Sequence, residues 1–160
     1  MAQADFFLKL DGVPGESIDD KHKGEIELES FSWGELNSGS SGHGGGGGAG
    51  KVVSQDLSIT KRIDKSSAVL MIACATGQHF KDAVLTARKA GGTQQEYLKI
   101  KLEEVLISSY QTSGGGSAMV QESVSFNFAK LEMAYKEQKP DGSLGGETKQ
   151  KYDFSANKKL

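Results

Sequence analysis

Hydrophobic and polar residues alternate along most of this chain, which is the pattern of β-strands that bury one face. Each alternating segment is short and is followed by a glycine-rich or polar stretch. The clearest segments are residues 6–10, 26–28, 57–59, 98–102 and 124–128. The pattern therefore predicts a mainly β chain with seven or eight strands.

The alternation changes phase after residues 26–28. From there the large apolar positions are Phe31 and Trp33, so one residue has been added to the repeat. A β-bulge inserts one such extra residue into a strand. We therefore expect a bulge near Ser30.

Two stretches keep the alternation for longer, residues 98–110 and 124–135, and the second contains one change of phase. They predict two long, bent strands. The sequence Pro140–Asp141–Gly142 is typical of a reverse turn. It should join a strand that ends near Gln138 to an antiparallel partner at residues 149–155.

One stretch departs from the alternation. Residues 68–75 are all apolar and rich in helix formers, with Ser66 or Ser67 as a possible N-cap and Gly77 as a possible end. This favours a short helix, mostly covered by the rest of the chain. A buried strand stays open as an alternative, because a short apolar run shows no decisive period.

Composition indicates a single compact domain over residues 1–160. The 17.0 kDa chain is long enough to bury a core without disulfides, and its one cysteine, Cys74, has no partner within the chain. This fits folding in a reducing compartment. The start of the chain has no basic segment before its short apolar run, and nowhere do 18 apolar residues follow one another, so we expect neither a signal peptide nor a membrane span.

Charge is distributed unevenly although the net charge is only −2. Residues 1–37 hold nine acidic and three basic residues, and the remainder of the chain has more basic than acidic residues. Such asymmetry can orient contacts between copies of a protein. Charged but solvated strand faces are the simpler interpretation.

The glycine tract raises the question of phosphate binding, because Gly45, Gly50 and Lys51 match most of a P-loop. A P-loop also needs a Ser or Thr after the lysine and a helix that starts there. Val52 stands at the hydroxyl position, and the residues that follow alternate like a strand. The sequence therefore argues against a nucleotide cofactor.

No other group of residues points to catalysis, metal or nucleic acid. Cys74 lies in the apolar run and is best explained as a packed thiol. The three histidines are far apart in sequence and fit surface or loop positions: His22, His43 and His79. Glu103 and Glu104 fall on opposite faces of a strand and so cannot act together on one bond. Asp19, Asp20 and Glu35 are expected at loop edges, with nothing basic or apolar nearby to tune a pKa. The basic clusters at 88–92 and 157–160 lack an aromatic platform for nucleic acid.

Long strands raise a separate problem, because their unpaired edges must be closed, covered or paired with another chain. Closure into a small antiparallel β-barrel of seven to eight strands, with the short helix packed at its side, would satisfy most of these edges. Two readings remain at this point. The chain is either a monomeric ligand-binding β-barrel or a barrel that assembles with its own copies.

Several long blocks of sequence resemble one known family. They are "FFLKLDGVPGES" (6–17), "HKGEIELESFSWG" (22–34), "GGGGGAGKV" followed by "QDLSITKRIDKSS", "RKAGGTQQEYLKIKLEEVLISSY" and "VSFNFAKLEMAYKEQKPDGSLGG". In these blocks the chain resembles Hcp, the haemolysin-coregulated proteins of the bacterial type VI secretion system. It departs from many members at Ala68, where proline is frequent, and in "KYDF" (151–154), where a tryptophan is frequent.

The resemblance implies a non-enzymatic structural protein without cofactor or metal. Six copies would form a ring around a channel, rings would stack head-to-tail into a tube, and effectors would travel inside it. Its partners would be the spike protein, the contractile sheath and effectors, with no nucleic acid and no membrane insertion. The protein would be cytoplasmic before assembly and then secreted without a signal peptide.

The resemblance also assigns a role to the glycine tract, since the long loop after the second strand contacts the neighbouring ring in such proteins. Glycines would let this loop adapt to a partner surface. The expected ring-stacking residues are Ser38, Gly39, Ser40, Ser41, Gly42, His43, Gly44, Gly45, Gly46, Gly47, Gly48, Ala49, Gly50 and Lys51.

One further expectation comes from the strand pattern. If Phe31 and Trp33 face the core, Ser32 between them faces the other way. In a ring of this kind that direction is the channel. Ser32 is therefore our candidate for a channel-facing contact with effectors, and an ordinary exposed serine is the simpler alternative.

Overall fold

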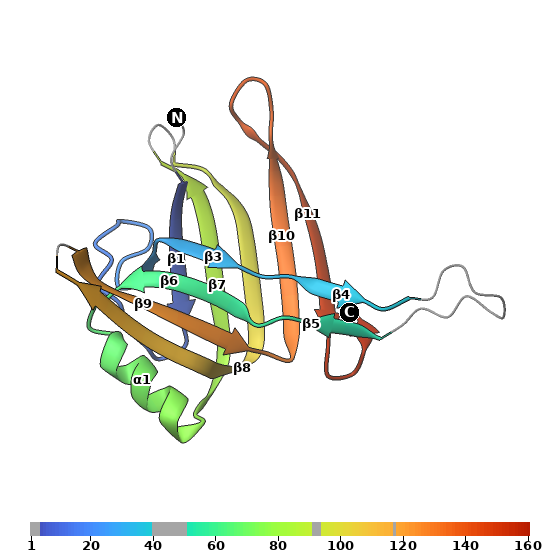
Figure 1. The fold of residues 1–160 in the computed structure, drawn as a ribbon. Coiled ribbons are helices and arrows are strands. Elements are labelled where there is room, and N and C mark those ends of the chain that lie inside the picture. Colours follow the sequence, from blue (N-terminus) through green and yellow to red (C-terminus); the bar gives the residue numbers. More distant parts are fainter. Residues whose placement is uncertain (1–3, 40–50, 91–93, 117) are drawn as a thin grey trace.

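The computed structural model describes residues 4–39, 51–90, 94–116 and 118–160. In that part of the chain, strands dominate and one helix lies beside them (Figure 1). The strands are β1 (Ala4–Leu10), β2 (Ile26–Leu28), β3 (Ser30–Ser32), β4 (Glu35–Asn37), β5 (Val52–Ser54), β6 (Leu57–Arg62), β7 (His79–Lys89), β8 (Glu96–Gly115), β9 (Ala118–Asn127), β10 (Lys130–Gln138), β11 (Leu144–Asp153) and β12 (Lys158–Lys159), and the helix is α1 (Ser67–Thr76). The predicted fold class, mainly antiparallel β with one short helix, is confirmed.

The described strands number twelve rather than seven or eight, because several are fragments of two or three residues. The first of these fragments arise where the sequence predicted a bulge. β2 ends at Leu28 and β3 begins at Ser30. At the break, the Glu29 amide donates to the carbonyl of Thr60 at 2.8 Å, so the chain changes its pairing partner there.

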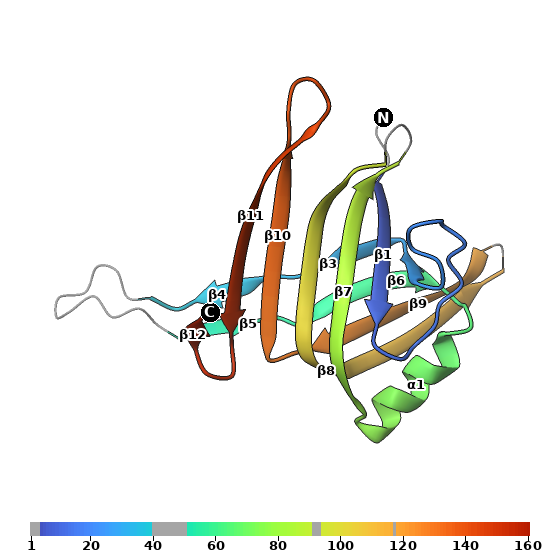
Figure 2. The same ribbon diagram turned by 180° about the vertical axis from the view of Figure 1, so that it is seen from behind.

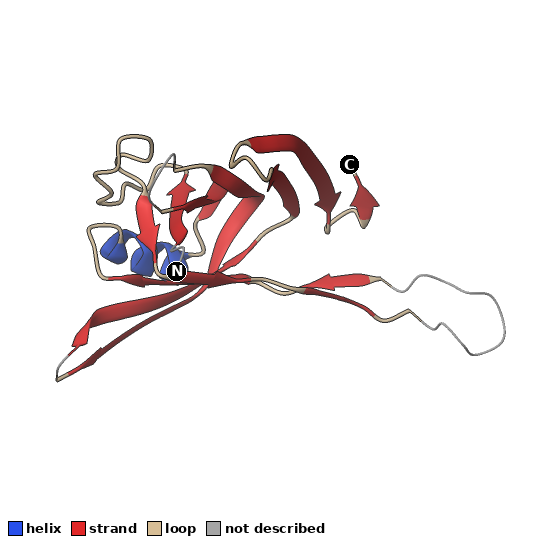
Figure 3. Cartoon of the chain, turned by 90° about the horizontal axis from the view of Figure 1, so that it is seen from above, coloured by secondary structure: helices blue, strands red, loops and turns tan. Residues whose placement is uncertain are grey.

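Ten strands form one antiparallel sheet that folds back on itself through β8. One layer has the order β12-β11-β10-β8-β7-β1-β2, and the second layer runs from β8 through β9 and β6 to β3. The ladders make a circuit that is completed by the bend between β2 and β3. Seen from above, the second layer continues into an arm formed by β4 and β5 (Figure 3). The ladders of the described residues therefore do not close into a complete barrel, and the bend between β2 and β3 links the two layers instead.

The long-strand prediction is correct for one of its two stretches. β8 spans twenty residues and belongs to both layers, with register shifts where it bends. The stretch 124–135 was wrongly expected to be one strand, because the chain leaves the second layer after Asn127 and joins the first layer at Lys130. The phase change marks this change of layer. The predicted hairpin of β10 and β11 is confirmed, with Gly142 in its turn at φ +88°.

The core lies between the two layers and under α1. Its fully buried side chains come from both layers and from the helix, and include Leu8, Ile26, Leu57, Ile59, Leu70, Leu85, Ile100, Leu102, Val105, Val124 and Phe126. Burying side chains of this size contributes about 1.5–3 kcal/mol each relative to exposure. Packing between the layers therefore fixes the position of the second layer, whose other face is exposed to solvent.

Helix α1 ends as expected and is less covered than expected. Gly77 adopts φ +69° as the C-cap, and its amide donates to the carbonyl of Ala73. Only Ser67, Leu70 and Ala73 are buried, so the prediction of a mostly covered helix is wrong. Eight consecutive apolar residues cannot all face one core, because a helix turns its side chains through every direction within about 3.6 residues. None of the described helices is long and apolar enough to cross a bilayer.

Candidate functional site

The outer face of the second layer is covered by small hydroxyl side chains. Ser32 of β3 pairs in register with Ser58 of β6, which pairs with Ser125 of β9, which pairs with Ser109 of β8. One serine from each of the four strands therefore forms a continuous row. Because successive residues of a strand point to opposite faces, the intervening Phe31 and Ile59 face the core.

A second row runs beside the first. It consists of Ser30, Thr60, Ser123 and Gln111, again one from each strand in register. The two rows line a shallow cleft of about 560 Å³, and no residue that lines it carries a charge. We call the two rows the hydroxyl face. Seven of its eight side chains are small hydroxyls and none is charged, so it offers hydrogen bonds without ion pairs.

Neighbouring hydroxyls of this face bond to one another. Ser58 Oγ and Ser125 Oγ lie 3.0 Å apart, and Ser30 Oγ lies 2.5 Å from Thr60 Oγ1. Each hydroxyl has one donor and two acceptor sites. After such pairing the face retains free acceptor sites.

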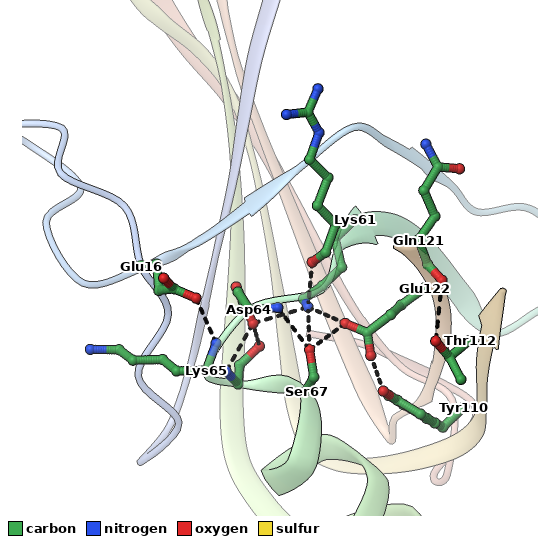
Figure 4. Close-up of polar contacts among 11 residues, drawn as sticks. Glu16, Lys61, Asp64, Lys65, Ser67, Tyr110, Thr112, Gln121 and Glu122 are labelled. Atoms are coloured by element: carbon green, nitrogen blue, oxygen red, sulfur yellow. Dashed lines mark hydrogen bonds and ion pairs between the residues drawn. The ribbon is translucent and has the colours of Figure 1, made fainter. Parts of the chain in front are cut away.

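A buried ion pair lies on the opposite side of β6 and β9 from the hydroxyl face, since its residues follow Thr60 and precede Ser123 in their strands. Figure 4 shows its polar contacts. Lys61 of β6 and Glu122 of β9 are cross-strand partners, and Lys61 Nζ lies 2.6 Å from Glu122 Oε1. Solvent reaches neither side chain. Lys61 also donates to Asp64 Oδ1 at 3.0 Å and to the carbonyl of Arg62 at 2.9 Å. The ammonium is thus fully paired by groups from the second layer and the segment before α1.

Hydroxyl groups connect this ion pair to the helix and to β8. Ser67, the first residue of α1, donates to Glu122 and accepts from the amide of Asp64 at 2.9 Å. The Tyr110 hydroxyl of β8 donates to the other Glu122 oxygen. Burial, together with the bond to Glu122, raises the pKa of Tyr110 to about 12. The network therefore ties α1 to three strands of the second layer.

The β4–β5 arm carries the base of the glycine tract. Leu36 and Val53 face each other across the two strands and are 66% and 61% exposed. Trp33 Nε1 donates to Ser54 Oγ at 3.0 Å and fixes the start of the arm. Of the expected ring-stacking residues, Ser38, Gly39 and Lys51 are exposed beside the arm, and residues 40–50 lie outside the described residues.

A family model described as "Type VI secretion system effector, Hcp" matches residues 7–135. Protein hcp1 of Pseudomonas aeruginosa is 51% identical over 144 residues, which are 89% of each chain. The chain belongs to the Hcp family.

Solved structures agree with this assignment. The crystal structure of Hcp1 from Salmonella typhimurium covers the whole of both chains at 36% identity, with a TM-score of 0.81. A structure described as a type six secretion system protein is 34% identical, covers 99% of this chain and 100% of its own, and has a TM-score of 0.93. The Hcp fold is thus shared over the full length described.

The Hcp chain places Ser32 as the strand pattern expected. Ser32 is exposed, whereas Phe31 and Trp33 are half-buried and pack against the core. Its contact with effectors stays a prediction. Sequence reasoning missed the other members of its row, because the sequence of one strand does not reveal its register with strands that are distant in sequence.

The glycine tract does not have the surroundings of a P-loop. Lys51 is followed by strand β5, and no helix begins there. Cys74 is half-buried and packs against the core, as a structural thiol would. Among the described residues, no three His, Cys, Asp or Glu side chains are placed to hold a metal ion.

Two expectations about titratable residues were wrong. His22 is not a surface histidine: its ring is buried, stacks on Phe7, and contacts Glu25 at 2.7 Å and Glu96 at 2.6 Å. Asp19 was expected to lack a basic neighbour, yet it binds the buried Arg88 guanidinium with both oxygens. The Arg88 hydrogen bond lowers the pKa of Asp19 to about 2. The His22–Glu96 and Asp19–Arg88 contacts each join residues about 70 positions apart, which explains why sequence reasoning missed them.

Proposed function

We propose that this Hcp chain is a structural, non-enzymatic subunit of the type VI secretion tube. Six copies form a ring around a channel, and rings stack head-to-tail. The tube associates with the spike protein, lies within the contractile sheath, and leaves the cell with its cargo when the sheath contracts. The subunit is cytoplasmic before assembly and needs neither a signal peptide nor a cofactor.

The hydroxyl face is the observation that carries this proposal. It is a broad, uncharged and hydrophilic strand surface, backed by a rigid core and a buried ionic network. A channel lining must bind cargo weakly enough to release it. Hydroxyl groups meet this need, because net hydrogen bonds contribute only about 0.5–1.5 kcal/mol each.

The oligomeric state tests the proposal directly. Light scattering of the purified chain should give about six times 17.0 kDa, and negative-stain images should show rings with a central hole. A stable species of 17.0 kDa in every buffer would instead identify a monomeric ligand-binding barrel. That result would end the tube proposal.

Ser32 tests the channel assignment. Ser32→Gln adds bulk within the serine row but leaves the core unchanged, so rings should form while retention of a cognate effector falls. Thr148→Gln, on the exposed part of β11, is the matched control and should retain the effector. Equal retention by both variants would remove Ser32 from the channel lining.

The arm and its glycine tract supply the contact between rings in this proposal. Deletion of residues 44–48 shortens the tract without touching β4 or β5. Rings should persist, and tubes should no longer form at high protein concentration. Normal tubes after this deletion would assign stacking to another surface. The next candidate would be attraction between the acidic residues 1–37 and the more basic remainder, tested by reversing charges in both regions.

A further inference from the structure

The outward side of α1 is an apolar surface that no part of the described chain covers. Val69, Met71 and Ile72 are 37%, 48% and 51% exposed, although each is a large hydrophobic residue. The helix has no acidic residue in its first turn and no basic residue in its last turn. Contiguous exposed apolar surface of this kind marks a contact with another molecule.

A second uncovered apolar surface lies where the arm leaves the barrel. Here Trp33, Leu131, Met133, Tyr152 and Phe154 line a cleft of about 410 Å³, and the other residues that line it are polar or charged: Glu35, Gln150, Lys151 and Lys159. Tyr152 and Trp33 each meet Phe154 edge to face, with ring centroids 5.0 and 6.4 Å apart. We call this cleft the aromatic groove.

The two surfaces lie on opposite sides of the molecule. In Figure 1, α1 packs below β8 and β9 at one side, and the arm with β10 and β11 forms the other side. The view from behind in Figure 2 shows the same separation. Neither surface can therefore reach the other within one chain.

Two different surfaces on opposite sides are suited to a heterologous contact, in which one copy's first surface meets the next copy's second surface. Repetition of such a contact closes into a ring when the rotation between copies divides a full turn. A symmetric dimer through α1 would cover the helix and leave the aromatic groove open. The heterologous contact covers both surfaces in every copy.

We infer that the apolar side of α1 docks in the aromatic groove of the next copy within the ring. This rests on the proposed ring function and adds to it the two surfaces that make the contact. The partner is a second copy of this chain. Met71 and Ile72 enter the neighbour's groove.

Paired cysteines test this contact. In a Cys74→Ser background, a chain that carries both Ile72→Cys and Met133→Cys should, on oxidation, give covalent oligomers that end at six copies on a denaturing gel. Chains with either cysteine alone should remain single. Covalent dimers from Ile72→Cys alone would show that two helices meet symmetrically, and would overturn the inference.

A charge on the helix tests the same contact without oxidation. Ile72→Lys changes a half-exposed residue, so the fold and its melting temperature should be kept, and the mass should drop from about six times 17.0 kDa to 17.0 kDa. Thr148→Lys is the control and should keep the ring.

The outcomes separate this inference from the function on which it rests. Rings in the unmodified chain together with rings in Ile72→Lys would overturn the contact and leave the tube proposal standing. A maleimide that labels Ile72→Cys fully in assembled rings would do the same, because this side of the helix would then be open to solvent in the ring. A monomeric unmodified chain would overturn both.

Discussion

Lys61 and Glu122 form an ion pair of 2.6 Å between neighbouring strands, out of reach of solvent. Taking two charges out of water is costly, and their attraction offsets that cost only when each charge stays fully paired. Here Asp64, Ser67 and Tyr110 supply the remaining partners. The pair therefore holds α1 and the second layer in one arrangement rather than adding much net stability.

Single removal of either charge should be severe. Lys61→Met leaves Glu122 buried without its cation, and Glu122→Met leaves Lys61 without its main anion, so each should lower the free energy of unfolding by about 3–5 kcal/mol. The double variant should recover more than half of that loss. Urea unfolding of the four proteins gives the coupling energy.

Arg62 at the end of β6 and Glu29 at the break between β2 and β3 provide the control, since their ion pair is exposed to solvent, with 63% of the Arg62 side chain exposed. Arg62→Met should change the free energy of unfolding by less than about 1 kcal/mol. Equal losses for Arg62→Met and Lys61→Met would contradict the role given to the buried pair.

Tyr110 makes stability depend on alkaline pH. Its pKa is raised from 10.0 to about 12, chiefly by burial and next by Glu122, so the folded chain holds this proton more tightly than the unfolded chain. The resulting stability is fully present below pH 10 and is lost as the pH rises toward 12. Urea unfolding of the native chain and of Tyr110→Phe should show a steeper alkaline decline for the native chain. Parallel curves would refute the assignment.

Asp19 makes stability depend on acidic pH. The bond to Arg88 lowers its pKa from 3.8 to about 2, so the stability it contributes is present above pH 3.8 and is lost as the pH falls toward 2. Asp19→Asn should remove this part of the acid transition. Nuclear magnetic resonance titration of the Asp19 carboxyl checks the value, and a midpoint near 3.8 in the folded chain would be inconsistent with the contact.

Local pattern was enough to predict several of the strands and how the helix ends, but it did not identify β7, His79–Lys89. Alternation located the strands because one side of each is buried, and Gly77 marked the helix end because its backbone is left-handed there. The break near Ser30 was also visible, since an added residue shifts the repeat. These features depend on neighbours in sequence, which is why one sequence reveals them.

Pairing between distant segments could not be predicted in the same way. The serine row needs the register of four strands, and Lys61 meets Glu122 across 61 positions of sequence. The uncovered side of α1 was missed for a related reason. An apolar run shows that a helix is to be buried, but not whether its own chain or another copy buries it.

Gly15 lies against the backbone at the start of strand β2. Its amide donates to the carbonyl of Gly24 at 2.8 Å, and a Cβ at this position would lie 2.4 Å from the Glu25 carbonyl oxygen and 2.7 Å from Ile26 Cα. Backbone atoms cannot move aside as a flexible side chain can, and Ile26 is fully buried. Gly15→Ala should therefore destabilise the fold by about 1–3 kcal/mol. Gly146→Ala, where nothing lies within 4 Å of the added carbon, is the control and should change the unfolding midpoint little. If thermal unfolding shows the same midpoint for both variants, the close approach at Gly15 does not hold the loop against the barrel.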